Sequence, residues 1–137
     1  IRQHQRPQPR LDVLNHLLVC KPAELPWRAG GTDSSDGLLA AVQGLCNSSG
    51  TGARLIRSQL PTAEDWPDGD LWDRWCLGGG EDFELVLSLP PAWADALEQA
   101  LPDCRRFGQI TDQTGSIVWT DDLGPVQDCG FDHFAPG

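Results

Sequence analysis

The sequence predicts an α+β fold: a layered α/β domain in which helices flank a mixed sheet. Segments with helical spacing of apolar residues alternate along the chain with short segments of strand-like pattern. The length of 137 residues fits one domain with a sizeable hydrophobic core. A hydrophobic content of 39% and six tryptophans are typical of a folded globular protein.

Apolar spacing defines the elements of the first half. Residues 6–10, which contain two prolines, predict an extended segment. Residues 11–20 carry leucines at helical spacing and predict a helix, which the sequence KPAELP ends. A second helix is predicted over 37–46, before the sequence NSSGTG. Residues 53–56 predict a short strand.

The second half continues the alternation. Residues 71–77 predict a helix, and 83–89 alternate apolar and polar residues with period two, which predicts a strand. Residues 91–101 form an amphipathic pattern with proline near its start and predict a helix. Residues 105–111 and 115–120 flank a short polar turn, so we expect a β-hairpin.

The net charge of −10 is unevenly distributed. Residues 1–30 carry five Lys or Arg against two Asp or Glu, whereas the remaining 107 residues carry five against eighteen. Such an acidic body repels polyanions, so we expect no nucleic-acid partner. No apolar run approaches the ~20 residues of a membrane span, so we expect no membrane partner and a cytoplasmic location.

The cysteines and the missing methionine add two expectations. The five cysteines are widely spread, with no CxxC pair, which disfavours a zinc site or a disulfide framework. We therefore expect reduced thiols, of which three lie in apolar, helix-like surroundings: Cys20, Cys46 and Cys76. The sequence contains no methionine, so we expect it to be part of a longer protein.

The stretch AGGTDSSDGLLAAV, residues 29–42, carries the first candidate site. Ser35 or Asp36 has the chemistry to cap the helix that follows. Asp33 and Asp36 also suit a Mg²⁺–phosphate complex beside the positive end of that helix. Taken alone, the pattern favours the cap and turn over the metal site.

The stretch LGGGEDFELVL, residues 77–87, carries the second. Three glycines before two acidic residues are typical of a helix end and turn. The same glycines would let backbone approach a ligand closely, with Glu81 directing a carboxylate into the site. The residues alone do not separate these two interpretations.

The order of the motifs resembles a known family. RPQPRL, DSSDGL, SSGTGARL, GGEDFEL and a terminal GFDHF follow one another as in the C-terminal domain of thiamine-monophosphate kinases. That family belongs to the superfamily of aminoimidazole ribonucleotide synthetase, whose C-terminal domain is the fold that the resemblance implies. The similarity runs from Arg6 to Phe134.

The resemblance implies a domain division and an activity. Residues 1–10 would lead in from another domain, and 11–137 would be the C-terminal kinase domain, without the N-terminal ATP-binding domain. The complete protein would transfer the γ-phosphate of ATP to thiamine monophosphate to give thiamine diphosphate, as a homodimer. This chain alone would be inactive. The alternatives are another ATP-dependent enzyme of the superfamily and a non-catalytic binding module with the same fold.

The resemblance also implies roles for individual residues. Asp33 and Asp36 would bind Mg²⁺, and Ser35 would contact the phosphates of ATP. Glu81 would contact the thiamine moiety of the substrate, and Phe131 would line the same pocket. Transfer between two phosphates needs no strong base, so no residue is assigned acid–base catalysis.

One departure from the family concerns the segment before Asp33. The family has an aliphatic residue where Ser34 stands, and RAGGTDSSD is rich in glycine and polar residues. We therefore expect the strand before the motif to be short or distorted. The arginines of residues 6–10 would reach phosphate across the domain junction.

Overall fold

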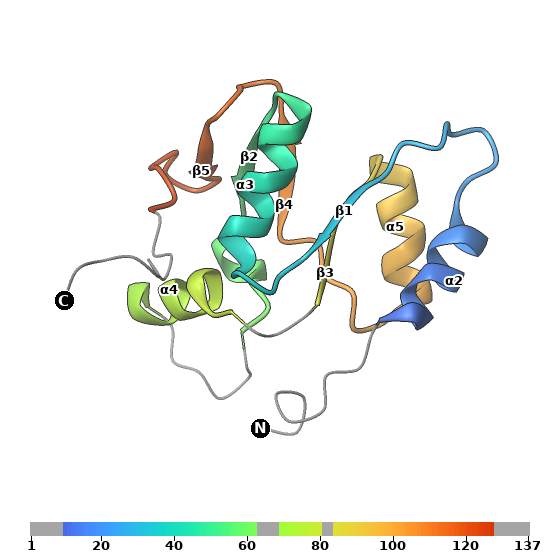
Figure 1. Cartoon of the computed structure of the whole chain (residues 1–137), viewed down its shortest axis with the longest axis horizontal. Helices are drawn as coiled ribbons and strands as arrows, with labels where there is room; N and C mark the ends of the chain where they lie inside the picture. The colour runs from blue at the N-terminus through green and yellow to red at the C-terminus, as the bar shows by residue number, and fades with distance from the viewer. Residues whose placement is uncertain (1–9, 63–68, 81–83, 128–137) are drawn as a thin grey trace.

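The computed structural model describes residues 10–62, 69–80 and 84–127 (Figure 1). Two helices, α2 (Leu11–Cys20) and α5 (Pro91–Ala100), lie side by side at one end of the molecule. The remaining elements gather around a central helix, α3 (Leu38–Ser49).

The predicted helices are present with small changes in their bounds. Helix α2 has the predicted ends, and α4 spans Asp70–Gly78 around the predicted 71–77. Helix α3 runs three residues beyond the predicted end, to Ser49. Gly50 ends it in the left-handed conformation, with φ 64°, and donates its N–H to the Asn47 and Cys46 carbonyls.

Three strands form a mixed sheet. The strands β2 (Gly52–Leu55), β4 (Gly108–Thr111) and β5 (Ile117–Trp119) lie in the order β4-β2-β5. Strand β2 pairs antiparallel with β4 and parallel with β5. Its last residue lies opposite the first residue of β4 and the last residue of β5. The predicted α+β class with a mixed sheet is confirmed.

The predicted hairpin of 105–111 and 115–120 is wrong, because β2 lies between the two strands. Gly52 explains how β2 enters. A Cβ on Gly52 would stand 2.1 Å from the Gln113 carbonyl oxygen and 2.4 Å from that of Ser116. A glycine therefore allows β2 to pass inside the turn between β4 and β5, where any side chain would collide with backbone.

Two further strands form a separate antiparallel pair. Strand β1 (Gly30–Asp33) pairs with β3 (Leu85–Ser88), and Asp33 lies opposite Leu85. The strand that leads into the first motif is four residues long, as are β2, β3 and β4. A short 3₁₀ turn, η1 (Arg57–Gln59), follows β2.

The hydrophobic core lies between α3 and the sheets. Helix α3 contacts β1, β2 and β3, and α4 packs against it. The apolar face of α3 thus packs against strands of both sheets. The buried members are Leu38, Leu39, Ala41, Val42, Cys46, Ala53, Leu55, Leu60, Leu77, Val86, Trp119 and Val126.

Helix α2 presents most of its leucines to solvent. Leu11, Leu14 and Leu18 are all about half exposed or more, whereas Val13 is buried. The contact with α5 includes a hydrogen bond of 3.0 Å from Trp93 Nε1 to the Leu17 carbonyl. The spacing of the leucines therefore predicted the helix but not the face that packs.

The part of the chain that the structure describes contains all but one of the cysteines that we expect to be reduced thiols. Four cysteines there are free thiols, and Cys129 lies outside the described residues. Cys46 is buried, and burial raises the pKa of its thiol. Cys20 and Cys76 are half-buried. Among the described helices, none has the length and apolar character that a membrane span requires.

Candidate functional site

The first motif forms the turn between β1 and α3. Asp33 ends β1, and its Oδ1 accepts hydrogen bonds from the Ser35 amide at 3.1 Å and the Ser35 hydroxyl at 2.6 Å. These bonds, the hydroxyl first, hold the pKa of Asp33 below its usual value. Asp33 therefore presents an ionised, exposed carboxylate at the end of the strand.

The expected side-chain cap is wrong. The N-cap of α3 is Gly37, with φ 103°, and no side chain caps the helix. The turn closes through its backbone instead, because Gly37 donates its N–H to the Ser34 carbonyl at 2.9 Å. Ser35 and Asp36 precede the cap, and Asp36 is exposed. Capping therefore does not account for the carboxylate of Asp36.

The two motifs lie against each other, although they are far apart in the sequence. A Cβ on Gly80 would stand 2.7 Å from the Ser35 carbonyl oxygen. A Cβ on Gly37 would stand 3.0 Å from the Leu77 carbonyl oxygen and 3.3 Å from the Gly78 carbonyl carbon. The glycines of both motifs therefore serve a close approach of two backbones, which no larger residue would permit.

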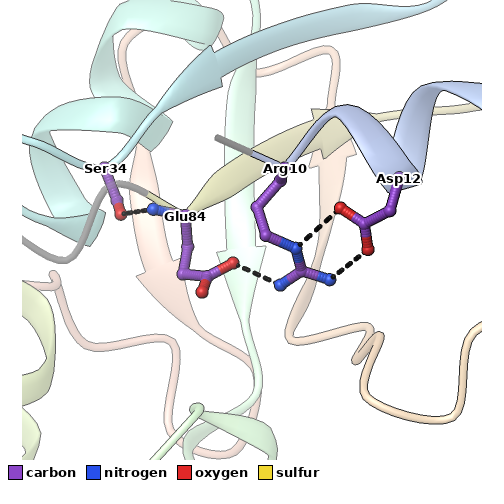
Figure 2. A network of polar contacts seen from close by, with 4 residues as sticks. All are labelled: Arg10, Asp12, Ser34 and Glu84. Atoms are coloured by element: carbon purple, nitrogen blue, oxygen red, sulfur yellow. Dashed lines mark hydrogen bonds and ion pairs between the residues drawn. The ribbon is translucent and has the colours of Figure 1, made fainter. Parts of the chain in front are cut away.

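Ser34 joins the turn to β3 and is the residue whose role the sequence did not reveal. Only 6% of its surface is exposed. Its amide donates to the Glu84 carbonyl at 2.9 Å, and its Oγ accepts from the Glu84 amide at 3.2 Å (Figure 2). One indication of this role was present in the sequence, because the resembled family has an aliphatic residue at the position of Ser34. Here that hydroxyl satisfies the backbone donor of Glu84, which lies within the second motif.

Arg10, just before α2, reaches the same place. Its Nη1 donates to Glu84 Oε2 at 2.7 Å. Its Nε and Nη2 donate to the two carboxylate oxygens of Asp12, at 3.3 and 3.4 Å. Figure 2 shows the guanidinium between these two carboxylates. In the structure, Arg10 therefore forms ion pairs with Asp12 on α2 and with Glu84 just before β3.

The remaining predicted site residues, Glu81 and Phe131, lie outside the described residues. Within the described ranges, no three His, Cys, Asp or Glu side chains gather as a metal cluster. A cation at this turn would thus depend on the two aspartates, Asp33 and Asp36, and on oxygen atoms from a ligand or water.

A separate hollow lies at the other end of β1. It has a volume of about 420 Å³, and Gly30, Leu45, Ser88 and Pro90 are among the residues that line it. Asp33, Ser35 and Asp36 do not line it. The candidate site on the turn is thus an open surface rather than this hollow.

Comparison with curated proteins finds similarity along almost the whole chain. The thiamine-monophosphate kinase of Prochlorococcus marinus is 46% identical over 136 residues, which cover 98% of this chain and 41% of that protein. That of Synechococcus elongatus is 42% identical over 137 residues, covering 98% and 42%. The chain thus spans about two fifths of the length of these relatives. No protein-family model matches it.

Solved structures share the fold. The structure described as AaThiL complexed with AMPPCP and TMP has a TM-score of 0.72 at 24% identity, and the match covers 97% of this chain and 40% of that one. The thiamine-monophosphate kinase of Stenotrophomonas maltophilia has a TM-score of 0.69 at 26% identity, covering 91% and 39%. Over nearly all of its length, the chain is therefore homologous to a segment of the thiamine-monophosphate kinases.

Proposed function

We propose that the chain is the C-terminal domain of a kinase that transfers the γ-phosphoryl group of ATP to thiamine monophosphate and so forms thiamine diphosphate. The observation that carries the proposal is the 46% identity to a thiamine-monophosphate kinase along 98% of the chain. The geometry agrees, because the two motifs of the resemblance lie in contact at one turn.

The phosphate end of the site would be the turn of residues 33–36. Both reactants are anions, so the barrier is dominated by bringing negative charges together in line. Ser35 would direct its hydroxyl to the ATP phosphates. The first amides of α3 lie just beyond the turn, at the positive end of a helix of 12 residues. Position and charge therefore supply the catalysis, without a general base.

The residues present fit a Mg²⁺ ion held by few protein ligands. Asp33 and Asp36 are exposed carboxylates, and Asp33 uses only Oδ1 toward Ser35. Mg²⁺ typically binds one or two carboxylates together with phosphate oxygens and water. Asp33 and Asp36 would hold the ion, which when bound neutralises charge on the phosphates.

The vitamin end of the site would involve Glu81 and Phe131. Glu81 follows Gly80 directly in the sequence, and Gly80 lies against Ser35. A carboxylate there would accept a hydrogen bond from the aminopyrimidine and attract the thiazolium cation. Phe131 would offer an aromatic wall to a flat cationic ring.

The complete protein would also contain the N-terminal domain with the rest of the ATP site, and we propose that it acts as a cytoplasmic homodimer. The test is an assay of thiamine diphosphate formation with the full-length protein, ATP and Mg²⁺. Product formed only when thiamine monophosphate and ATP are both present supports the proposal. Hydrolysis of ATP without thiamine diphosphate would reject it in favour of another enzyme of the superfamily. Absence of both reactions would favour a binding module.

A further inference from the structure

An ion pair beside the site has no role in the functions considered above. We propose that the Arg10–Glu84 pair positions the turn of residues 33–36, so that Arg10 and Glu84 are positioning residues for the phosphate end of the site. The assignment of a phosphate ligand to this turn rests on the proposed function. The positioning of the turn by Arg10 and Glu84 rests on the contacts between these residues.

The main chain of Glu84 is hydrogen-bonded to Ser34. Both backbone groups of Glu84 are used, since its carbonyl accepts from the Ser34 amide and its amide donates to Ser34 Oγ. Ser34 is almost fully buried, so water cannot replace these partners without opening the structure. Any displacement of Glu84 therefore moves Ser34 or breaks two hydrogen bonds of that buried residue.

Ser34 in turn is connected to the candidate ligand residues, Asp33 and Ser35. Ser34 lies between Asp33 and Ser35 in the chain, and its carbonyl accepts the Gly37 amide that closes the turn. The carboxylate of Asp33 is in turn bonded to Ser35. The orientation of both residues thus depends on where Glu84 holds Ser34.

The side chain of Glu84 is bound by Arg10. Arg10 Nη1 lies 2.7 Å from Glu84 Oε2, and Asp12 binds the guanidinium through Nε and Nη2 (Figure 2). The Arg10 side chain is 28% exposed and that of Glu84 is 42% exposed. An isolated pair of this kind contributes little stability. Here the carboxylate belongs to Glu84, the residue whose main chain anchors the turn. Even a weak ion pair to this carboxylate therefore acts on the position of the turn.

The proposal differs from a direct contact between Arg10 and phosphate, which the resemblance implied. If Arg10 positions the turn through Glu84, exchanging the two charges restores the contact. If Arg10 binds phosphate itself, the exchange places a carboxylate where a cation is needed. Arg10→Glu, Glu84→Arg and the double variant R10E/E84R therefore separate the two roles.

The experiment uses the full-length protein and two measurements. Hydrogen–deuterium exchange of peptides spanning 30–38 reports the amides of Ser34 and Gly37 without any ligand. We expect each single variant to speed that exchange by about three- to fivefold, and the double variant to return it toward the starting rate. Steady-state kinetics should show a similar rise in KM for Mg-ATP, of about three- to fivefold, with the KM for thiamine monophosphate unchanged.

Arg106 provides the matched control. It forms ion pairs with Asp95 and Glu98 on α5, at 3.2 Å to Glu98, and its side chain is 38% exposed. Arg106→Glu should leave exchange over 30–38 and both KM values unchanged. Equal effects of Arg10→Glu and Arg106→Glu would reduce the pair to a general stabilising contact and overturn the proposal.

The remaining outcomes are also decisive. Unchanged exchange in folded Arg10→Glu and Glu84→Arg overturns the proposal, and so does a double variant no better than the single ones. If charge reversal prevents folding, Arg10→Lys keeps the charge but loses the fork between Glu84 and Asp12. Arg10→Lys should speed the exchange measurably, but by less than about two- to threefold. An unchanged exchange rate would reject the positioning role. A wild-type protein without kinase activity rejects the proposed function, while the exchange experiment still tests the ion pair.

Discussion

Replacement of Ser34 by alanine tests the contact that joins the two motifs. The change removes the Oγ acceptor and leaves the Glu84 amide without the partner that it has in the structure. Ser34 is only 6% exposed, so we expect the unpaired donor to cost about 1–2 kcal/mol of unfolding free energy. For a domain of this size, that corresponds to a fall in Tm of about 4–8 °C. Thermal unfolding of the 137-residue chain, followed by circular dichroism, measures it.

Ser48→Ala is the control for this prediction. The Ser48 hydroxyl donates to the Leu45 carbonyl at 3.0 Å, but the residue is exposed on α3. Such a back bond contributes little to a helix, so we expect a Tm within about 1–2 °C of the starting protein. If Ser34→Ala unfolds at the same temperature as Ser48→Ala, a stabilising hydrogen bond from the Glu84 amide to the buried Ser34 hydroxyl is refuted.

Three further predictions concern the site. In the full-length protein, Asp33→Asn and Asp36→Asn should lower kcat/KM by about a hundredfold or more while leaving Tm nearly unchanged, because both carboxylates are exposed and neither caps α3. Variants that lose Tm but keep their rate would restore a purely structural role. Glu81→Gln and Phe131→Ala should weaken binding of thiamine monophosphate, by about five- to thirtyfold for Phe131→Ala, and leave that of a non-hydrolysable ATP analogue unchanged in calorimetry. Equal weakening of both ligands would indicate general misfolding instead. The 137-residue chain alone should fold but form no thiamine diphosphate, and robust turnover in the same assay would contradict the proposed missing domain.

Much of the secondary structure follows from local sequence patterns. The spacing of apolar residues predicted α2, α3, α4 and α5 with ends within about three residues. The period-two alternation in 83–89 predicted a strand, and the structure places β3 within it. Periodicity succeeds here because it is a property of the local backbone, and each of these helices and strands carries its own pattern.

The pairing of strands could not be predicted in the same way. Residues 105–111 and 115–120 have the spacing of a hairpin, yet β2 from far earlier in the chain lies between β4 and β5. The preference for a short turn is local, whereas insertion of β2 depends on Gly52 fitting against the backbone of that turn. Likewise, the helical spacing in α2 does not predict which face of the helix packs. That face is set by the contact with α5, which lies far away in the sequence.

The sequence by itself determined where the two motifs of the candidate site lie and predicted their chemistry. Paired aspartates around a serine, and glycines before an acidic residue, are recognisable because ligands and tight turns need those residue types. Only the tertiary structure decided that the motifs touch, through Gly37 and Gly80, and that Ser34 joins them. It also decided that Gly37, rather than a side chain, caps α3. The physical reason is that close backbone approach and the pairing of a partly buried amide depend on partners distant in sequence, and no local pattern records those partners.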